Sequence, residues 1–187
     1  GSIPVPARPF FGGARLIALT KTAGSYRPIA CGEILRRLTA KLLCMEVRKK
    51  AKEFFLKHQQ MGVGIPGGAE AMTHSARRVV ESWRSANRSD RVAFKFDMVN
   101  AFNTVDRTRM LACVAEAFPE LLQYATWAYG SATNLLFGSA FIESTTGVQQ
   151  GDPLGPLLFS VPLAEAWHTT RVRVLALAYP GTRRGIG

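Results

Sequence analysis

Acidic residues are scarce in this chain, and the scarcity is uneven. The 187 residues include 13 Asp and Glu against 24 Lys and Arg, which gives a formal charge of +11. Residues 1–91 hold 17 basic and 6 acidic residues, whereas residues 92–187 hold 7 of each. The whole excess of positive charge therefore lies in the N-terminal half. A one-sided basic surface usually faces a polyanion, nucleic acid before an anionic membrane. A merely solvated surface would mix the two signs more evenly.

Cysteine and long apolar runs are scarce as well. The three cysteines lie far apart and have neither metal-type spacing nor a plausible disulfide framework. This predicts reduced thiols in an intracellular protein. The three histidines are also too widely separated for a metal site. No apolar run approaches the roughly twenty residues that span a bilayer, and the N-terminus has no secretion pattern, so we expect no membrane partner.

The chain does contain enough apolar residues for a core. Its hydrophobic content is 47%, and its length suits one domain or one and a half. Prolines and glycines in residues 1–13 predict an extended lead-in. The elements expected in the N-terminal half are strands at 16–19 and 26–29 joined as a hairpin, a helix at about 33–57, a loop at 62–68 and a helix at about 69–85.

Strand and helix patterns continue to alternate in the C-terminal half, which predicts an α+β fold of antiparallel hairpins with packed helices. Asp106 is expected to cap a helix, and Pro119 suits the first turn of another. The expected elements are strands at 92–97, 134–137, 140–143 and 172–179, and helices at about 107–118, 119–129 and 157–167.

Two segments present polar groups on apolar elements. Asp97 ends the strand F-K-F-D, where a carboxylate with little local flexibility suits hard cations such as Mg²⁺. Residues 147–159 read G-V-Q-Q-G-D-P-L-G-P-L-L-F, a stiff loop with Gly and Pro before a helix. An exposed strand-end acid and a structural turn are the plain alternatives, but turn rules explain the Gln-Gln-Gly part poorly.

Together and in this order, the two segments resemble conserved blocks of reverse transcriptases, those of non-LTR retroelements most closely. The stretch N-A-F-N-x-V-D-R at 100–107 is close to the pattern that follows the metal-binding aspartate in that family. The resemblance therefore implies that Asp97 is the catalytic, metal-binding aspartate. It also implies that Phe102 is the steric gate, whose ring disfavours a 2′-hydroxyl and so favours deoxynucleotides. A core phenylalanine is the alternative for Phe102.

The resemblance implies further roles. In the family, the Gln-Gly-x-Pro-Leu-Gly-Pro loop lies against the templating base and the incoming nucleotide, which assigns these contacts to Gln150 and Gly151. Lys21 and Arg27, at a hairpin tip, are similar to the fingers residues that hold the triphosphate. A further block matches the loop that contacts the template backbone, with Gly62, Gly64, Pro66, Gly67 and Gly68. The same glycines fit a dinucleotide-binding pattern, but a Lys-rich helix precedes them and Pro66 interrupts them, so we set that interpretation aside.

The resemblance implies a right-hand polymerase fragment. We expect a basic fingers region at 14–91, a partial palm at 92–179 and a tail outside the resemblance at 180–187. The implied cofactor is Mg²⁺ or Mn²⁺, and the implied partners are an RNA template, a DNA primer, a deoxynucleotide and possible ribonucleoprotein proteins. The nucleus is the compartment that the resemblance favours.

One element of the family pattern is replaced. Family members carry an aromatic-x-Asp-Asp hairpin after the second block, whereas Tyr179 is followed here by P-G-T-R-R-G, and no acidic residue follows Glu165. One carboxylate cannot hold two metal ions. We therefore predict that this chain does not extend a primer, and that the tail is a truncated or out-of-frame end. The alternative is a non-catalytic RNA-binding scaffold in a ribonucleoprotein, with a degenerate reverse transcriptase fold.

Overall fold

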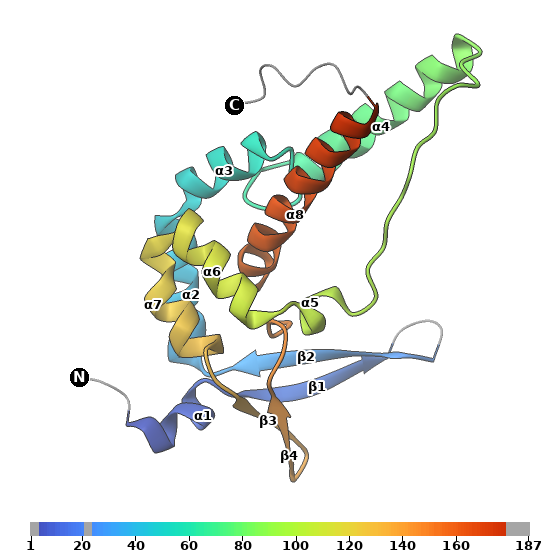
Figure 1. Ribbon diagram of the computed structural model, residues 1–187. Helices are drawn as coiled ribbons and strands as arrows, with labels where there is room; N and C mark the ends of the chain where they lie inside the picture. Colours follow the sequence, from blue (N-terminus) through green and yellow to red (C-terminus); the bar gives the residue numbers. More distant parts are fainter. Residues whose placement is uncertain (1–3, 21–23, 179–187) are drawn as a thin grey trace.

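A four-stranded sheet underlies the molecule. The computed structural model describes residues 4–20 and 24–178 (Figure 1). The strands are β1 (Ala14–Thr20), β2 (Tyr26–Gly32), β3 (Thr133–Phe137) and β4 (Ala140–Ser144), in the order β2-β1-β3-β4. Two antiparallel hairpins, β1–β2 and β3–β4, are joined by a short parallel pairing of β1 with β3. The hairpin near the N-terminus thus shares its sheet with one from the C-terminal half, and both hairpins were predicted.

Seven helices of the described residues lie to one side of this sheet (Figure 1). They are α2 (Ile34–Glu46), α3 (Arg48–Lys57), α4 (Gly68–Ser85), α5 (Ala101–Thr104), α6 (Arg107–Ala117), α7 (Pro119–Tyr129) and α8 (Gly155–Ala178). The predicted cap is present, because the Asp106 carboxylate accepts a hydrogen bond from the backbone amide of Arg109 at 2.6 Å. The α+β class is confirmed, and the loop at 62–68 and the helix that follows it agree with the sequence prediction.

The core lies among α2, α3, α6, α7 and the first half of α8. Its largest fully buried side chains include Tyr129, Phe55, Phe118 and Met110. Val148 and Leu154 join the same cluster from the loop before α8. The loop is therefore anchored in the core at both of its ends.

The lead-in is helical rather than extended. A short 3-10 helix η1 (Val5–Ala7) runs into α1 (Arg8–Phe11), with Pro9 in the first turn, where its missing N–H costs nothing. The side chain of Arg8 holds α1 to the body by donating to the carbonyls of Trp127 at 3.1 Å and Thr126 at 2.5 Å.

The predicted helix at 33–57 is two helices, because the chain turns at Val47. Apolar side chains in the first of these helices point outward, with Ile34 77% and Leu38 52% exposed. The buried face instead carries Arg36 and Ala40, which lie one turn apart.

Two predicted strands are absent. Residues 92–97 are all exposed and have no ladder partner among the residues that the structure describes, and the predicted strand at 172–179 is a continuation of α8 as far as residue 178. Residue 179 lies outside the described residues. A strand needs a neighbour to satisfy its backbone groups, whereas a helix satisfies them locally. Pro162 lies within α8 without ending it.

The most exposed helix is α4, which projects from the body (Figure 1). Gly68 is its only buried residue, and the segment 86–100 returns from its far end to α5. Over the residues that the structure describes, no helix is both long and apolar enough to cross a membrane.

Candidate functional site

Four of the five residues predicted to bind nucleotide, together with the predicted metal ligand Asp97, line a single pocket of about 870 Å³. They come from three separate segments: the start of β2, the stretch 97–102 and the loop 149–156. The five residues are Arg27, Asp97, Phe102, Gln150 and Gly151. Lys21 lies outside the described residues. The structure therefore brings these side chains together, while their roles stay predictions.

The loop is joined to strand β2 on one side of the pocket. The amide of Ala30 donates to the carbonyl of Gln150 at 2.6 Å. Gly151 has φ +121, and a Cβ built on it would lie 2.4 Å from the carbonyl oxygen of Ala30. Only glycine fits this close approach in this backbone conformation. The sequence assigned Gly151 to the nucleotide, and the contact with β2 supplies an additional, structural requirement for it.

The loop is joined to α5 on the other side. The amide of Val148 donates to the carbonyl of Phe102 at 2.7 Å, and the amide of Gly147 donates to that of Val105 at 3.0 Å. The Phe102 ring stacks on Phe159 of α8, with ring centroids 4.9 Å apart and an interplanar angle of 17°. The ring of Phe102 is thus fixed by its own backbone and by an aromatic neighbour, and it still lines the pocket.

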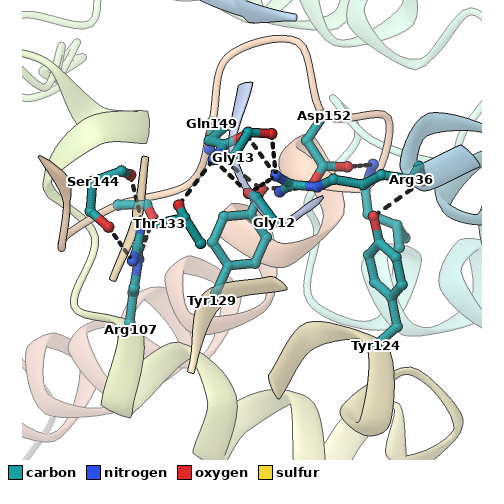
Figure 2. Close-up of polar contacts among 12 residues, drawn as sticks. Gly12, Gly13, Arg36, Arg107, Tyr124, Tyr129, Thr133, Ser144, Gln149 and Asp152 are labelled. Atoms are coloured by element: carbon teal, nitrogen blue, oxygen red, sulfur yellow. Dashed lines mark hydrogen bonds and ion pairs between the residues drawn. The ribbon is translucent and has the colours of Figure 1, made fainter. Parts of the chain in front are cut away.

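A buried polar network lies behind the loop (Figure 2). The guanidinium of Arg36 donates to Gln149 Oε1 at 2.8 Å and to Asp152 Oδ2 at 3.2 Å. It also donates to the carbonyl of Gly12, which in turn accepts from Gln149 Nε2 at 3.2 Å. Asp152 Oδ1 accepts from the amide of Leu154 at 2.9 Å. The loop is held by charge-assisted bonds that originate in α2.

Tyr129 fills the space between two buried arginines. The guanidinium carbons of Arg36 and Arg107 lie 5.4 and 5.3 Å from its ring centroid. Its hydroxyl donates to Asp152 Oδ2 at 2.6 Å. Burial, followed by the negative charge of Asp152, raises the pKa of Tyr129 well above 10.0, so the phenol keeps its proton and remains a donor.

Arg107 fixes the approach to the loop. Its guanidinium donates to the carbonyls of Gly147 and Ser144 at 2.8 Å each, and to Ser144 Oγ at 2.8 Å (Figure 2). A single side chain thereby joins the start of α6 to the end of β4 and the start of the loop. Arginine suits this task because its planar fork presents five donors.

Sequence reasoning did not single out Arg36, Arg107, Tyr129, Gln149 or Asp152. Arginine is rarely buried, so neither arginine was expected in the core. A signal for Arg36 was nevertheless present, since it lies four residues before Ala40, on the same helical row as the buried positions.

Asp97 differs from its neighbours in the pocket. It is exposed, it makes no side-chain hydrogen bond to another described residue, and it follows an unpaired segment. It was predicted at the end of a buried strand, and that prediction is wrong because the strand has no partner among residues 4–20 and 24–178.

The pocket does not bring together a cluster of metal-ligating side chains among the described residues. The second carboxylate at its wall is Asp152, whose side chain is 2% exposed and already bonded to Arg36 and Tyr129. Within the described ranges, no three Asp, Glu, His or Cys side chains gather as metal ligands. Reverse transcriptases generally use divalent metal ions, but Asp97 alone does not supply a two-metal cluster.

The residues predicted to contact the template lie elsewhere. The loop at 62–68 packs against α3, and a Cβ on Gly64, which has φ +72, would be 3.7 Å from Ala51 Cβ. None of the five template-contacting residues lines the pocket that holds Asp97. The structure thus separates the two predicted groups and leaves their roles as predictions.

Comparison with known families agrees with the resemblance seen in the sequence. Residues 19–179, which are 161 of the 187, match the model of the family described as reverse transcriptase (RNA-dependent DNA polymerase). No curated protein matches the chain.

Proposed function

The chain belongs to the reverse transcriptase (RNA-dependent DNA polymerase) family, and we propose that it provides the fingers and the partial palm of such an enzyme. In this proposal it binds an RNA template with a DNA primer and holds the incoming deoxynucleotide in the pocket beside Gln150. The observation that carries the proposal is the convergence of five predicted residues from three segments on that one pocket.

The chemistry of the pocket suits a nucleoside triphosphate. Arg27 is exposed near the tip of the hairpin and supplies a cation for phosphates. Gln150 and Gly151 present polar backbone and an amide at the wall, on a loop that Arg36 and Arg107 hold in place. The stacked ring of Phe102 supplies a rigid surface beneath the sugar, where it disfavours a 2′-hydroxyl. These are the contacts by which we expect the pocket to select a deoxynucleotide.

We propose that this chain alone does not join nucleotides. Phosphoryl transfer by polymerases requires two metal ions that stabilise both the attacking and the leaving oxygens. Asp97 is the one pocket carboxylate without bonds to other described side chains. The proposed activity of the 187-residue chain is therefore binding and selection, without extension of the primer.

Selection of the nucleotide tests the proposal. A fluorescent RNA template annealed to a DNA primer is titrated with the chain in Mg²⁺ buffer, with or without a deoxynucleotide that matches the next template base. We expect the matched deoxynucleotide to tighten binding several-fold, and a mismatched or ribose nucleotide to have little effect. Arg27→Ala should remove the gain, whereas Arg15→Ala, on the same hairpin but outside the pocket, should keep it.

Two outcomes contradict the proposal at different points. Equal binding with matched and mismatched nucleotides in the wild-type chain argues against a nucleotide pocket. Extension of the primer that disappears in Asp97→Ala argues against the catalytic incompleteness, while it leaves the pocket standing.

A second candidate function is a non-catalytic RNA-binding scaffold. The exposure of Asp97 on an unpaired segment favours it, because a scaffold has no need of a rigid metal ligand. In that case the salt-dependent affinity for RNA remains, but the matched deoxynucleotide has no effect on it. The titration described above therefore separates the two candidates.

A further inference from the structure

Two histidines from opposite halves of the chain meet in the fold. His58 follows the last residue of α3, and His168 lies in the second half of α8. Their ring centroids are 6.1 Å apart, and the rings are inclined at 75° to each other. The wide spacing of the histidines along the sequence predicted no metal site, but that spacing carries no information about contacts between distant helices. The pair is therefore a feature that only the structure reveals.

The core holds the ring of His58 from one side. This ring packs on Phe54, with ring centroids 4.3 Å apart. Phe54 in turn contacts the rings of Phe55 and Phe118, at centroid distances of 5.2 and 5.3 Å. Both of these phenylalanines are fully buried. The half-buried His58 is thus positioned by packing alone, as a binding residue needs to be.

One of the two ring nitrogens of His58 already has a partner. Nδ1 lies 2.8 Å from the backbone carbonyl oxygen of Phe54. Because a carbonyl oxygen can only accept, Nδ1 carries the proton and donates it, which leaves the free lone pair on Nε2. Histidines that bind metal ions typically donate their other ring N–H to a carbonyl or carboxylate in this way, which fixes the tautomer and the orientation of the ring.

His168 supplies a second imidazole on the open side of the pair. It is exposed, and its side chain forms no hydrogen bond with another described residue. Glu165, on the preceding turn of α8, is engaged elsewhere, since its carboxylate contacts Arg109 and accepts from Cys113 at 2.8 Å. Within residues 4–20 and 24–178, no third His, Cys, Asp or Glu joins the two histidines.

The distance between the two rings suits a shared metal ion. Zn²⁺ lies about 2.0–2.1 Å from a bound imidazole nitrogen, and hence about 3.2 Å from the centre of the ring. Two rings that share one ion therefore have centres about 5 Å apart at a tetrahedral angle and about 6.5 Å apart at the widest angle. The observed 6.1 Å falls within this range, so the rings need to move little.

We propose that His58 and His168 bind a divalent cation of the Zn²⁺ class and thereby join α3 to α8. Imidazole nitrogen suits Zn²⁺, Ni²⁺ and Cu²⁺, whereas Mg²⁺ prefers oxygen ligands. Water takes the remaining positions, so the affinity is lower than that of a zinc site closed by four protein ligands. The site goes beyond the proposed function and does not depend on it, because neither histidine lines the pocket that holds Asp97.

The ion gives the exposed half of α8 an anchor. Residues 166–171 are all exposed, so this stretch of the helix has little packing of its own. A link from His168 through the ion to His58 ties it to a side chain that rests on the core. Zn²⁺ should therefore slow amide exchange in this stretch. At about 100 times the dissociation constant it should also raise the melting temperature of the chain by a few degrees.

The experiment measures zinc binding by the whole chain. ZnCl₂ is titrated by isothermal calorimetry in a reducing buffer that contains excess Mg²⁺, which competes for carboxylates such as Asp97. The deciding variant is His168→Ala, which should keep the wild-type circular dichroism because this side chain is exposed. The matched control is His74→Ala, which removes the third histidine of the chain from an exposed position on α4.

We expect the wild-type chain to bind one Zn²⁺ and His168→Ala to lose about 100-fold in affinity. A second ligand held in place raises affinity by about 10²–10⁴-fold, and the variant forfeits that gain. His74→Ala should leave the affinity nearly unchanged, and NiCl₂ should rank the three proteins in the same order. In histidine ¹H–¹⁵N spectra, Zn²⁺ should shift the Nε2 signal of His58 while Nδ1 keeps its proton.

Three results overturn the site. They are a zinc affinity that His168→Ala retains, equal losses in His168→Ala and His74→Ala, and an Nε2 signal of His58 that saturating Zn²⁺ leaves in place. Binding that disappears in Asp97→Ala but persists in His168→Ala belongs to the first of these and assigns the ion to the nucleotide pocket. The nucleotide titration described above uses Mg²⁺ alone, so the proposed function and the zinc site stand or fall separately.

Discussion

Two segments of this molecule line the same pocket and differ in almost every physical respect. The loop at 146–154 is tied to its surroundings by backbone bonds to β2 and α5 and by the buried side chains of Arg36 and Arg107. The segment at 91–100 is exposed at every residue, and no strand partner lies beside it in the described part of the chain. Gln150 and Gly151, two of the residues predicted to bind nucleotide, lie on the first segment, and the predicted metal ligand Asp97 lies on the second.

The difference lies in where each segment finds its partners. The loop satisfies its polar groups with α2, α5, α7 and β2, all of which belong to this chain. The segment at 91–100 carries Phe94 and Phe96, which are 78% and 79% exposed, so its apolar side chains find no such cover. The loop, which forms one wall of the pocket, is thus held in place without help from the segment at 91–100, and the two segments can be perturbed separately.

The largest expected effect is a difference in the free energy of unfolding between variants of the two acidic residues of the pocket, Asp152 and Asp97. Asp152→Ala leaves Arg36 buried without its carboxylate, because their side chains are only 2% and 3% exposed. We expect a loss of about 3–5 kcal/mol in the free energy of unfolding. Asp97→Ala, in the exposed segment, should change it by less than about 0.5 kcal/mol. Urea denaturation followed by circular dichroism measures both.

Asp152→Asn is the milder companion variant. Its amide oxygen still accepts from Tyr129 or Leu154, so the variant should fold even if Asp152→Ala does not. A similar stability for Asp97→Ala and Asp152→Ala would contradict the contrast between the two segments.

The next effect tests the join between the loop and β2. Gly151→Ala places a methyl group 2.4 Å from the Ala30 carbonyl oxygen, at φ +121. Gly138→Ala has a positive φ of +59 but no heavy atom within 4 Å of the new methyl group. We expect Gly138→Ala to cost about 1 kcal/mol and Gly151→Ala to cost more, because backbone strain and a clash add. Equal losses in thermal melts would show that β2 does not confine the loop.

A pH effect on stability tests the packing of α6 against α8, further from the pocket. Cys113 donates to Glu165 Oε2 at 2.8 Å, and burial, followed by this bond, raises the pKa of the thiol from 9.0 to about 11. The folded state therefore holds the thiol proton more tightly than the unfolded state. This contribution is fully present below pH 9 and is lost as the pH rises through about 11.

The matching variant isolates that contribution. Cys113→Ala should lose less stability than the wild-type chain between pH 8.5 and pH 11, when urea midpoints are compared at each pH. A parallel decline in the two proteins would show that the thiol keeps an ordinary pKa and that α6 and α8 pack less tightly there.

The smallest effect is expected in the exposed segment. Phe94→Ser with Phe96→Ser removes two rings that are more than three-quarters exposed. We expect a change in unfolding free energy within about 0.5 kcal/mol, because little buried surface is lost. A large loss, measured by the same urea titration, would show that these rings are covered in solution.

Local patterns in the sequence predicted the elements that depend on neighbours close along the chain. The hairpin of β1 and β2, the Asp106 cap and the helix after Pro119 are of this kind. The strands at 92–97 and 172–179 were wrong because a strand is completed by a partner distant in sequence, and neither segment has one in the described structure. The alternating residues showed what a strand needs, but not whether a neighbour was present.

The candidate site shows the same contrast between features that local sequence patterns predict and features that depend on contacts distant in sequence. Motif positions indicated Arg27, Phe102 and Gln150, and the structure brings them to one pocket. The residues that hold the loop in place could not be found in this way, since Arg36 and Asp152 are 116 residues apart and each resembles a surface charge. Their pairing depends on the packing of α2 against the loop.

Amide hydrogen exchange tests the contrast between the two segments most directly. The amides of Ala30 and Val148 bond to carbonyls across the joins of the loop, whereas residues 92–97 lie outside any helix or strand. We predict that Ala30 and Val148 exchange orders of magnitude more slowly than the amides of residues 92–97, which should exchange at nearly unfolded rates. Comparable protection in the two segments would contradict the claim that the loop at 146–154 is held in place by the rest of the chain while the segment that carries Asp97 is not.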